Sequence, residues 1–123
     1  MNKQDFILIE NKANKIVELL VQEIDGFSDS EEFLRLDDKD RKTAGIVCGA
    51  FANYISRTYS EGIAGPLLEK AFATIETLSS IQDVDVENLV ATEILENIYF
   101  DEFPELIQKL GNKSKALYDR WLT

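Results

Sequence analysis

Residues 84–98 read VDVENLVATEILENI, and apolar side chains recur in this stretch at steps of three or four positions. This spacing places on one helical face Val86, Leu89, Val90, Ile94 and Ile98. An earlier segment has the same spacing and carries Phe72, Ile75 and Leu78. A polar break at residues 79–85 separates the two segments. The pattern therefore predicts a helical hairpin, and we expect the rest of the chain to be organised around it.

The same part of the chain is strongly acidic. Residues 71–108 contain no Lys or Arg, although the whole chain has 13 basic residues. The nine acidic residues of this segment are Glu76, Asp83, Asp85, Glu87, Glu93, Glu96, Asp101, Glu102 and Glu105. Basic residues gather before position 58 and after position 108, with Lys70 alone between them. We therefore expect the outer surface of the hairpin to be a negative platform that attracts a positively charged partner.

Periodic apolar residues also predict helices before the hairpin. A first helix over residues 3–25 would bury a stripe of Phe6, Ile9, Ala13, Ile16, Leu20 and Ile24. Gly26 is its expected end. A short helix around Phe33 follows, and then a longer one over about residues 38–59, capped by Asp37 or Asp38. Small residues such as Gly45 and Gly49 let another helix approach closely, so we predict that this longer helix is the central one.

Helix-starting and helix-ending residues set the remaining boundaries. The expected helices run from Pro66 to Ser79, from an Asp83 or Asp85 cap to about Phe100, from Pro104 to Gly111, and through Leu117, Tyr118, Trp121 and Leu122. No segment shows convincing period-two alternation, which makes strands improbable. We predict a single all-α domain over residues 1–123, a compact bundle of six or seven helices.

Charge and composition exclude several functions. A formal net charge of −10 and a pI near 4.4 disfavour binding to nucleic acid or to an anionic membrane surface, because both present phosphates that Lys and Arg must neutralise. The single cysteine, Cys48, lies in an apolar run and is expected to be a buried small hydrophobe. No stretch reaches the ~18 to 20 apolar residues of a membrane span, and no signal-peptide core is present. We therefore expect a cytoplasmic protein.

Catalytic and metal-binding patterns are weak. The chain has no histidine, which removes the commonest general base and metal ligand. Asp83, Asp85 and Glu87 match the first acidic positions of a calcium loop, but Asn88 and Ile94 stand where glycine and glutamate are needed. We predict no enzyme activity, no cofactor and no metal site.

Two carboxylate pairs leave one enzymatic alternative open. Glu93 with Glu96, and Glu102 with Glu105, resemble the magnesium-binding pairs of all-α nucleotide pyrophosphohydrolases. The two pairs here are only five residues apart, whereas those enzymes separate theirs by about a dozen or more. A solvated acidic face explains them better.

Aromatic side chains interleave with the acids near the end of the hairpin. Tyr99, Phe100 and Phe103 are too close together for one helical stripe to bury all three. One or two of them are expected to close the core. An aromatic that stays exposed among carboxylates would anchor a basic partner, because the ring supplies contact area and the acids supply specificity.

The C-terminal half resembles a known group of proteins. Asp85-Val86-Glu87-Asn88-Leu89-Val90-Ala91-Thr92-Glu93-Ile94-Leu95-Glu96-Asn97, followed by Leu110-Gly111-Asn112-Lys113-Ser114-Lys115-Ala116-Leu117-Tyr118-Asp119-Arg120-Trp121, is similar to small bacterial α-helical immunity proteins of contact-dependent or polymorphic toxin systems. The resemblance implies a HEAT-like helical hairpin and a 1:1 complex between a monomer and a cognate toxin domain. Many such toxins are basic nucleases, which agrees with the charge argument.

The leading hypothesis is therefore a cytoplasmic immunity protein that binds and neutralises a basic toxin. The residues expected to bind the partner are Asp83, Asp85, Glu87, Glu93, Glu96, Tyr99, Phe100, Asp101, Glu102, Phe103 and Glu105. The alternatives are a general helical interaction module or homodimer, and the magnesium-dependent nucleotide pyrophosphohydrolase.

Overall fold

A computed structural model describes residues 12–62 and 65–123. The longer helices are α2 (Lys12–Glu23), α4 (Ala44–Ser60), α5 (Pro66–Ser79) and α7 (Asn112–Leu122). The shorter elements are η1 (Phe27–Asp29), α3 (Glu31–Leu34), η2 (Asp40–Lys42), α6 (Val84–Asn88), η3 (Leu89–Ile94), η4 (Leu95–Asn97) and η5 (Pro104–Lys109). Of these, η3 is a π-helix and the other η segments are 3₁₀. No strand occurs within the described ranges, and the predicted all-α bundle is confirmed.

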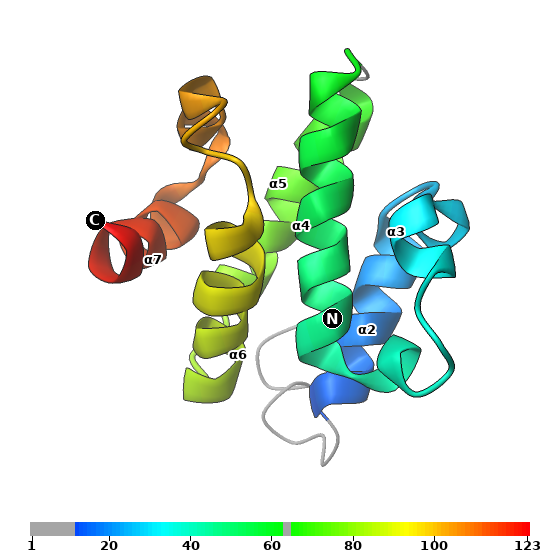
Figure 1. Cartoon of the computed structure of the whole chain (residues 1–123). Helices are drawn as coiled ribbons and strands as arrows, with labels where there is room; N and C mark the ends of the chain where they lie inside the picture. The colour runs from blue at the N-terminus through cyan, green and yellow to red at the C-terminus, as the bar shows by residue number, and fades with distance from the viewer. Residues whose placement is uncertain (1–11, 63–64) are drawn as a thin grey trace.

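Helix α4 lies at the centre, with α2 and α3 on one side and α6, η3 and α7 on the other (Figure 1). It contacts α2, α3, α5 and η3 directly. The glycine side of α4 faces η3, and a Cβ atom added at Gly45 would be in ordinary van der Waals contact with the Glu93 side chain, at 3.7 Å. The prediction that this helix is the central one is confirmed.

The start of α4 differs from the sequence-based expectation. The helix begins at Ala44 rather than near Asp38, and η2 precedes it. The Asp37 carboxylate accepts a hydrogen bond from the backbone N–H of Asp40 at 2.8 Å, which favours a local turn. Thr43 is then extended, so the chain changes direction before α4 begins.

Most of the predicted stripe of the first helix that falls in the described residues is buried, and Ala13 is half-buried. Ile16, Leu20 and Ile24 are almost fully buried, whereas Phe6 and Ile9 lie outside the described residues. Gly26 follows with a φ of 80°, and a Cβ atom there would lie 2.8 Å from the Tyr54 hydroxyl oxygen. Glycine at this position therefore satisfies both the backbone conformation and the close approach of α4.

The predicted hairpin is formed by α5 and the continuous helical segment α6–η4. Asp83 is its N-cap, and its carboxylate accepts hydrogen bonds from the backbone N–H groups of Asp85 and Val86 at 2.9 and 3.2 Å. The second helix was expected to reach Phe100 but ends at Asn97. The side-chain amide of Asn97 donates a hydrogen bond to the Glu93 carbonyl oxygen at 2.8 Å. Such a bond competes with the backbone hydrogen bonds of the helix, and the next residue, Ile98, is extended.

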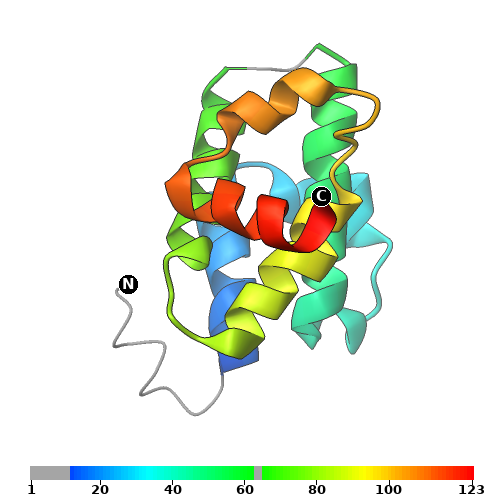
Figure 2. The ribbon, with the colours of Figure 1, turned by 90° about the vertical axis from the view of Figure 1, so that its left-hand side faces the viewer.

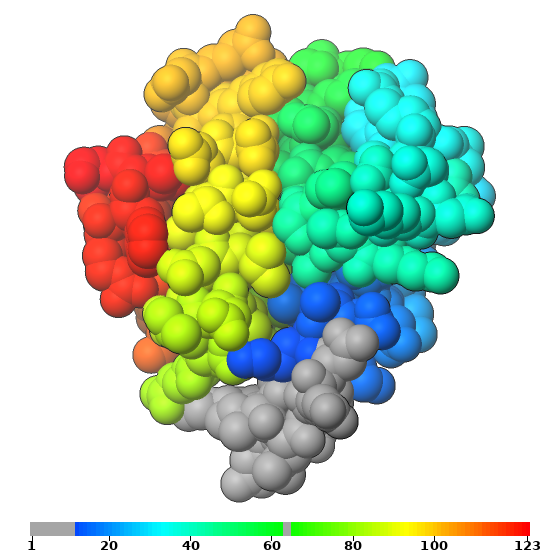
Figure 3. Space-filling view, turned by 60° about the horizontal axis from the view of Figure 1, so that its bottom comes forward, coloured from blue at the N-terminus to red at the C-terminus, as the bar shows by residue number. Residues whose placement is uncertain are grey.

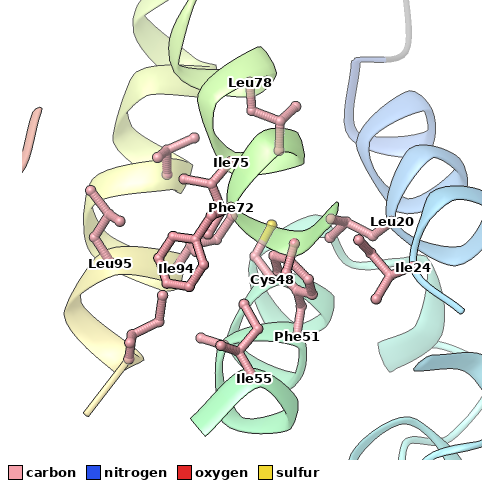
Figure 4. Packing of buried hydrophobic residues seen from close by; sticks show 14 of the residues in the cluster. Leu20, Ile24, Cys48, Phe51, Ile55, Phe72, Ile75, Leu78, Ile94 and Leu95 are labelled. Atoms are coloured by element: carbon pink, nitrogen blue, oxygen red, sulfur yellow. The ribbon is translucent and has the colours of Figure 1, made fainter. Parts of the chain in front are cut away.

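The core joins both sides of α4 in one hydrophobic cluster. Figure 4 shows Cys48, Phe51 and Ile55 of α4, Leu20 of α2 with Ile24 just after that helix, Phe72, Ile75 and Leu78 of α5, and Ile94 and Leu95 of the hairpin's second arm. Cys48 is completely buried, as predicted. Burial, with a smaller contribution from the Glu93 charge, raises the pKa of its thiol to about 12. Among the described residues, no helix is long and apolar enough to cross a membrane.

Candidate functional site

The first acids of the second hairpin arm are paired with the start of the described chain. The Lys12 ammonium lies 2.7 Å from a carboxylate oxygen of Asp83 and 3.3 Å from one of Asp85. The Lys12 hydrogen bond, together with the capping hydrogen bonds, outweighs burial and lowers the pKa of Asp83. These two acids therefore connect the start of α2 to the hairpin, although the Asp85 side chain remains 73% exposed.

Two further acids also have partners within the chain. Glu87 pairs with Arg120 of α7 at 3.1 Å. Glu105 accepts a hydrogen bond from the Tyr59 hydroxyl at 2.6 Å, and this bond lowers the pKa of Glu105. The sequence-based platform treated all these carboxylates as unneutralised. That is corrected for Asp83, Asp85 and Glu87, because folding brings Lys12 and Arg120 to them, whereas the hydrogen bond from Tyr59 leaves Glu105 charged.

Glu76 has a structural role. Its carboxylate accepts hydrogen bonds from the backbone N–H groups of Lys113 and Ser114 at 2.8 and 2.9 Å, and from the Ser114 hydroxyl at 2.8 Å. Burial opposes ionisation of Glu76, but the hydrogen bonds from Ser114 and Lys113 outweigh it and lower its pKa. The acid thus caps the first turn of α7 and fixes that helix against α5.

Four acids remain, and in the described ranges no Lys or Arg forms an ion pair with them. They are Glu93, Glu96, Asp101 and Glu102. Glu93 borders a hollow of about 260 Å³ over Gly45 and Gly49, which Arg35 also borders. The other three acids border a second hollow on the opposite side of η3–η4. The predicted platform is therefore smaller than the sequence indicated, and it is divided.

The second hollow has a volume of about 380 Å³ and lies between the end of the hairpin and α7. Glu96, Tyr99, Asp101 and Glu102 border it, and we call these four residues the Tyr99 surface. Tyr118 and Leu122 of α7 form the facing wall. Figure 2 shows the C-terminal end of α7 beside η3–η4, and Figure 3 shows the segment around residues 90–100 on the surface between α4 and α7.

The turn that carries the Tyr99 surface is held on α4. The backbone N–H of Tyr99 donates to the buried Ser56 hydroxyl at 3.2 Å. Phe103 packs edge-on against Tyr59 at 5.1 Å between ring centroids. These contacts, with the Tyr59–Glu105 hydrogen bond, fix the turn at both ends. The exposed side chains therefore project from a supported backbone.

The three aromatics of the turn occupy different environments. Phe100 is 5% exposed and packs edge-on against Tyr118, with ring centroids 5.2 Å apart. Phe103 is half-buried, and Tyr99 is 50% exposed. The prediction that one or two aromatics close the core is confirmed. Of the aromatics expected to bind a partner, Tyr99 is the exposed one, whereas Phe100 belongs to the core.

The two E-x-x-E pairs do not come together as a metal site. Glu93 and Glu96 border different hollows, while Glu105 is hydrogen-bonded to Tyr59. In residues 12–62 and 65–123, no group of three or more His, Cys, Asp or Glu residues is placed to hold a metal ion.

Sequence reasoning missed the residues contributed by α7. Tyr118 and Leu122 were assigned only to a final helix, and their position beside the Tyr99 surface depends on the contacts that fix α7 against α5. No local pattern in the chain contains that information. Lys12 and Arg120, which neutralise the acids at the start of the second hairpin arm, were likewise not identified as their partners.

Residues 17–123 match a family whose description is "Domain of unknown function (DUF7674)". Neither the curated proteins nor the solved structures contain a significant match to the chain.

Proposed function

The chain belongs to the DUF7674 family, and we propose that it is an immunity protein that binds and neutralises a basic toxin domain through the Tyr99 surface. The observation that carries this proposal is the combination, around one hollow, of an exposed tyrosine and three carboxylates that form no ion pair within residues 12–62 and 65–123. Such a surface supplies both charge complementarity and an aromatic contact for a cationic protein.

The charge of the whole molecule supports the same partner class. A net charge of −10 attracts a basic protein over a distance and repels nucleic acid. Carboxylates at the rim mainly raise the association rate, whereas a desolvated anchor at the centre slows dissociation. In this proposal the charge gives rapid capture of the toxin, and the hollow gives the complex its lifetime.

The proposed mechanism is steric and electrostatic coverage. A nuclease toxin needs Lys and Arg side chains to hold the phosphates of its substrate. Carboxylates presented by a supported turn occupy those cationic groups in place of phosphate. The inhibitor would act as a monomer in a 1:1 complex in the cytoplasm, where the toxin meets its substrate.

A growth experiment tests the proposal. The product of the neighbouring gene is expressed in cells with and without this chain. Growth without the chain measures toxicity, and growth with the wild-type chain measures protection. We expect the double variant Asp101→Lys/Glu102→Lys to lose protection while it remains folded. The matched control is Asp38→Lys/Glu69→Lys, which makes the same charge change at two exposed positions away from the hollow.

Two outcomes would overturn the proposal. The first is a neighbour that neither arrests growth nor forms a complex with this chain, which would leave a general interaction module or homodimer. The second is equal protection by the wild type and by Asp101→Lys/Glu102→Lys, because the toxin would then bind elsewhere.

A further inference from the structure

The Tyr99 surface has the dimensions of a site for one side chain and its flanking backbone. Its hollow of about 380 Å³ falls in the lower part of the range of roughly 300–1,000 Å³ found for ligand sites. The charged side chains that border it, Glu96, Asp101 and Glu102, are all carboxylates. A single positively charged side chain complements this lining.

The remaining lining selects among cations. Tyr99 offers an exposed ring, and Tyr118 and Leu122 add aromatic and aliphatic surface on the facing wall. A guanidinium group is planar, stacks on aromatic rings and forms two parallel hydrogen bonds to carboxylates, whereas an ammonium is a compact, strongly hydrated charge. The methylene stem of an arginine also packs well on apolar walls.

The chain contains an arginine in a site of the same composition. The Arg57 guanidinium carbon lies 5.8 Å from the centre of the Tyr54 ring. Its nitrogens pair with Glu31 at 3.2 Å, Glu32 at 2.6 Å and Glu61 at 3.2 Å. One tyrosine and three carboxylates thus hold an arginine within this fold. The Tyr99 surface has the same set of groups, and in the described ranges no basic side chain pairs with its carboxylates.

From this correspondence we infer that the hollow at the Tyr99 surface binds an arginine side chain of the partner protein. This inference rests on the proposed function and specifies its central contact. The guanidinium lies against the Tyr99 ring and is paired with Asp101 or Glu102. The arginine stem contacts Leu122.

A peptide titration tests the inference without knowledge of the partner. The ¹⁵N-labelled full chain is titrated at low salt with acetyl-Gly-Arg-Gly-amide and, separately, with acetyl-Gly-Lys-Gly-amide. Amide shifts give the binding position and the affinity. We expect shifts at residues 95–102 and 118–122, with the arginine peptide binding about three- to fivefold more tightly than the lysine peptide.

Variants separate the ring from the charge. Tyr99→Ala should weaken binding of the arginine peptide by about fivefold or more and reduce the preference for it over the lysine peptide. Tyr99→Phe should keep both the affinity and the preference. Trp121→Ala is the matched control, because Trp121 is an exposed aromatic of α7 outside the hollow. Equal affinities for the two peptides, full binding by Tyr99→Ala, or shifts centred away from the hollow would overturn the inference.

The inference and the proposed function fail in different ways. Normal protection by Tyr99→Ala, together with lost protection by Asp101→Lys/Glu102→Lys, would keep the immunity function and reject the arginine anchor. Arginine-selective peptide binding without any growth protection would support the arginine site and reject the immunity function.

Discussion

Asp83, Asp85 and Glu87 lie at the start of the second hairpin arm, and Glu96, Asp101 and Glu102 lie at its end. The two groups are equally acidic in the sequence. At the start, Lys12 pairs with Asp83 and Asp85, Arg120 pairs with Glu87, and Asp83 also caps the helix. At the end, a turn fixed on α4 places around a hollow the acids that form no ion pair with any described Lys or Arg. The first group therefore stabilises the fold, and the second is available to a partner.

The largest expected effect concerns the turn at the end of the hairpin. Phe100→Ala should lower the free energy of unfolding by about 3–5 kcal/mol, because it removes a buried ring that packs on Tyr118. Tyr99→Ala should change it by no more than about 0.5 kcal/mol, since half of that side chain is exposed. Urea unfolding followed by circular dichroism measures both. Similar losses for the two variants would show that the turn does not separate core from surface in this way.

Gly111→Ala should give the next largest effect, by disturbing the acid that fixes α7. A Cβ atom at position 111 would lie 2.5 Å from the carboxyl carbon of Glu76. We expect a loss of about 1–3 kcal/mol, as in other overpacked sites. The exposed neighbour Asn112→Ala serves as the control.

A double-mutant cycle tests the cause of the Gly111→Ala effect. Glu76→Ala should lower the free energy of unfolding by less in the Gly111→Ala variant than in the wild type, because both changes break the same contact. Strict additivity would contradict the proposed role of Glu76.

A smaller effect compares the two acidic groups directly. Asp83→Ala removes an N-cap and should cost about 1 kcal/mol of stability. Asp101→Ala should stay within about 0.5 kcal/mol of the wild type. Thermal unfolding of the two variants side by side gives the difference. If Asp101→Ala were as destabilising as Asp83→Ala, the division between structural and available acids would fail.

The smallest effect is a change in the pH dependence of stability. The pKa of Glu76 is lowered from 4.5 in the folded chain, so the unfolded chain binds its proton first as the pH falls. The stabilisation from Glu76 is therefore complete above about pH 5 and is lost as the pH falls through and below 4.5. Between pH 7 and pH 3, the free energy of unfolding should fall less steeply for Glu76→Gln than for the wild type. An equally steep profile would assign the acid sensitivity to other groups.

Local signals predicted much of the fold. Pro66 and Ser79 bound α5 as expected, Gly26 follows the first described helix, and Asp83 caps the hairpin's second arm. These features depend on backbone preferences and on hydrogen bonds between near neighbours. The early end at Asn97 was missed because a side-chain hydrogen bond to the Glu93 carbonyl oxygen, rather than a breaker such as glycine or proline, accompanies it.

The site was less predictable because its charges are neutralised over long sequence separations. Lys12 is 71 residues from Asp83, and Arg120 is 33 residues from Glu87. Which acids meet a cation depends on how α2 and α7 pack, and composition alone does not contain that packing. The same holds for Tyr118 and Leu122, whose position at the hollow depends on how α7 packs against α5 and η3.

The account is tested most directly by mapping a cationic probe on the two acidic groups. The ¹⁵N-labelled chain is titrated with a hexaarginine peptide at low salt, and Asp101→Asn/Glu102→Gln is compared with Asp83→Asn/Asp85→Asn. We predict amide shifts centred on residues 96–102, and about tenfold weaker binding for the first variant but not for the second. Shifts centred on residues 83–87, or equal weakening by the two variants, would contradict the account.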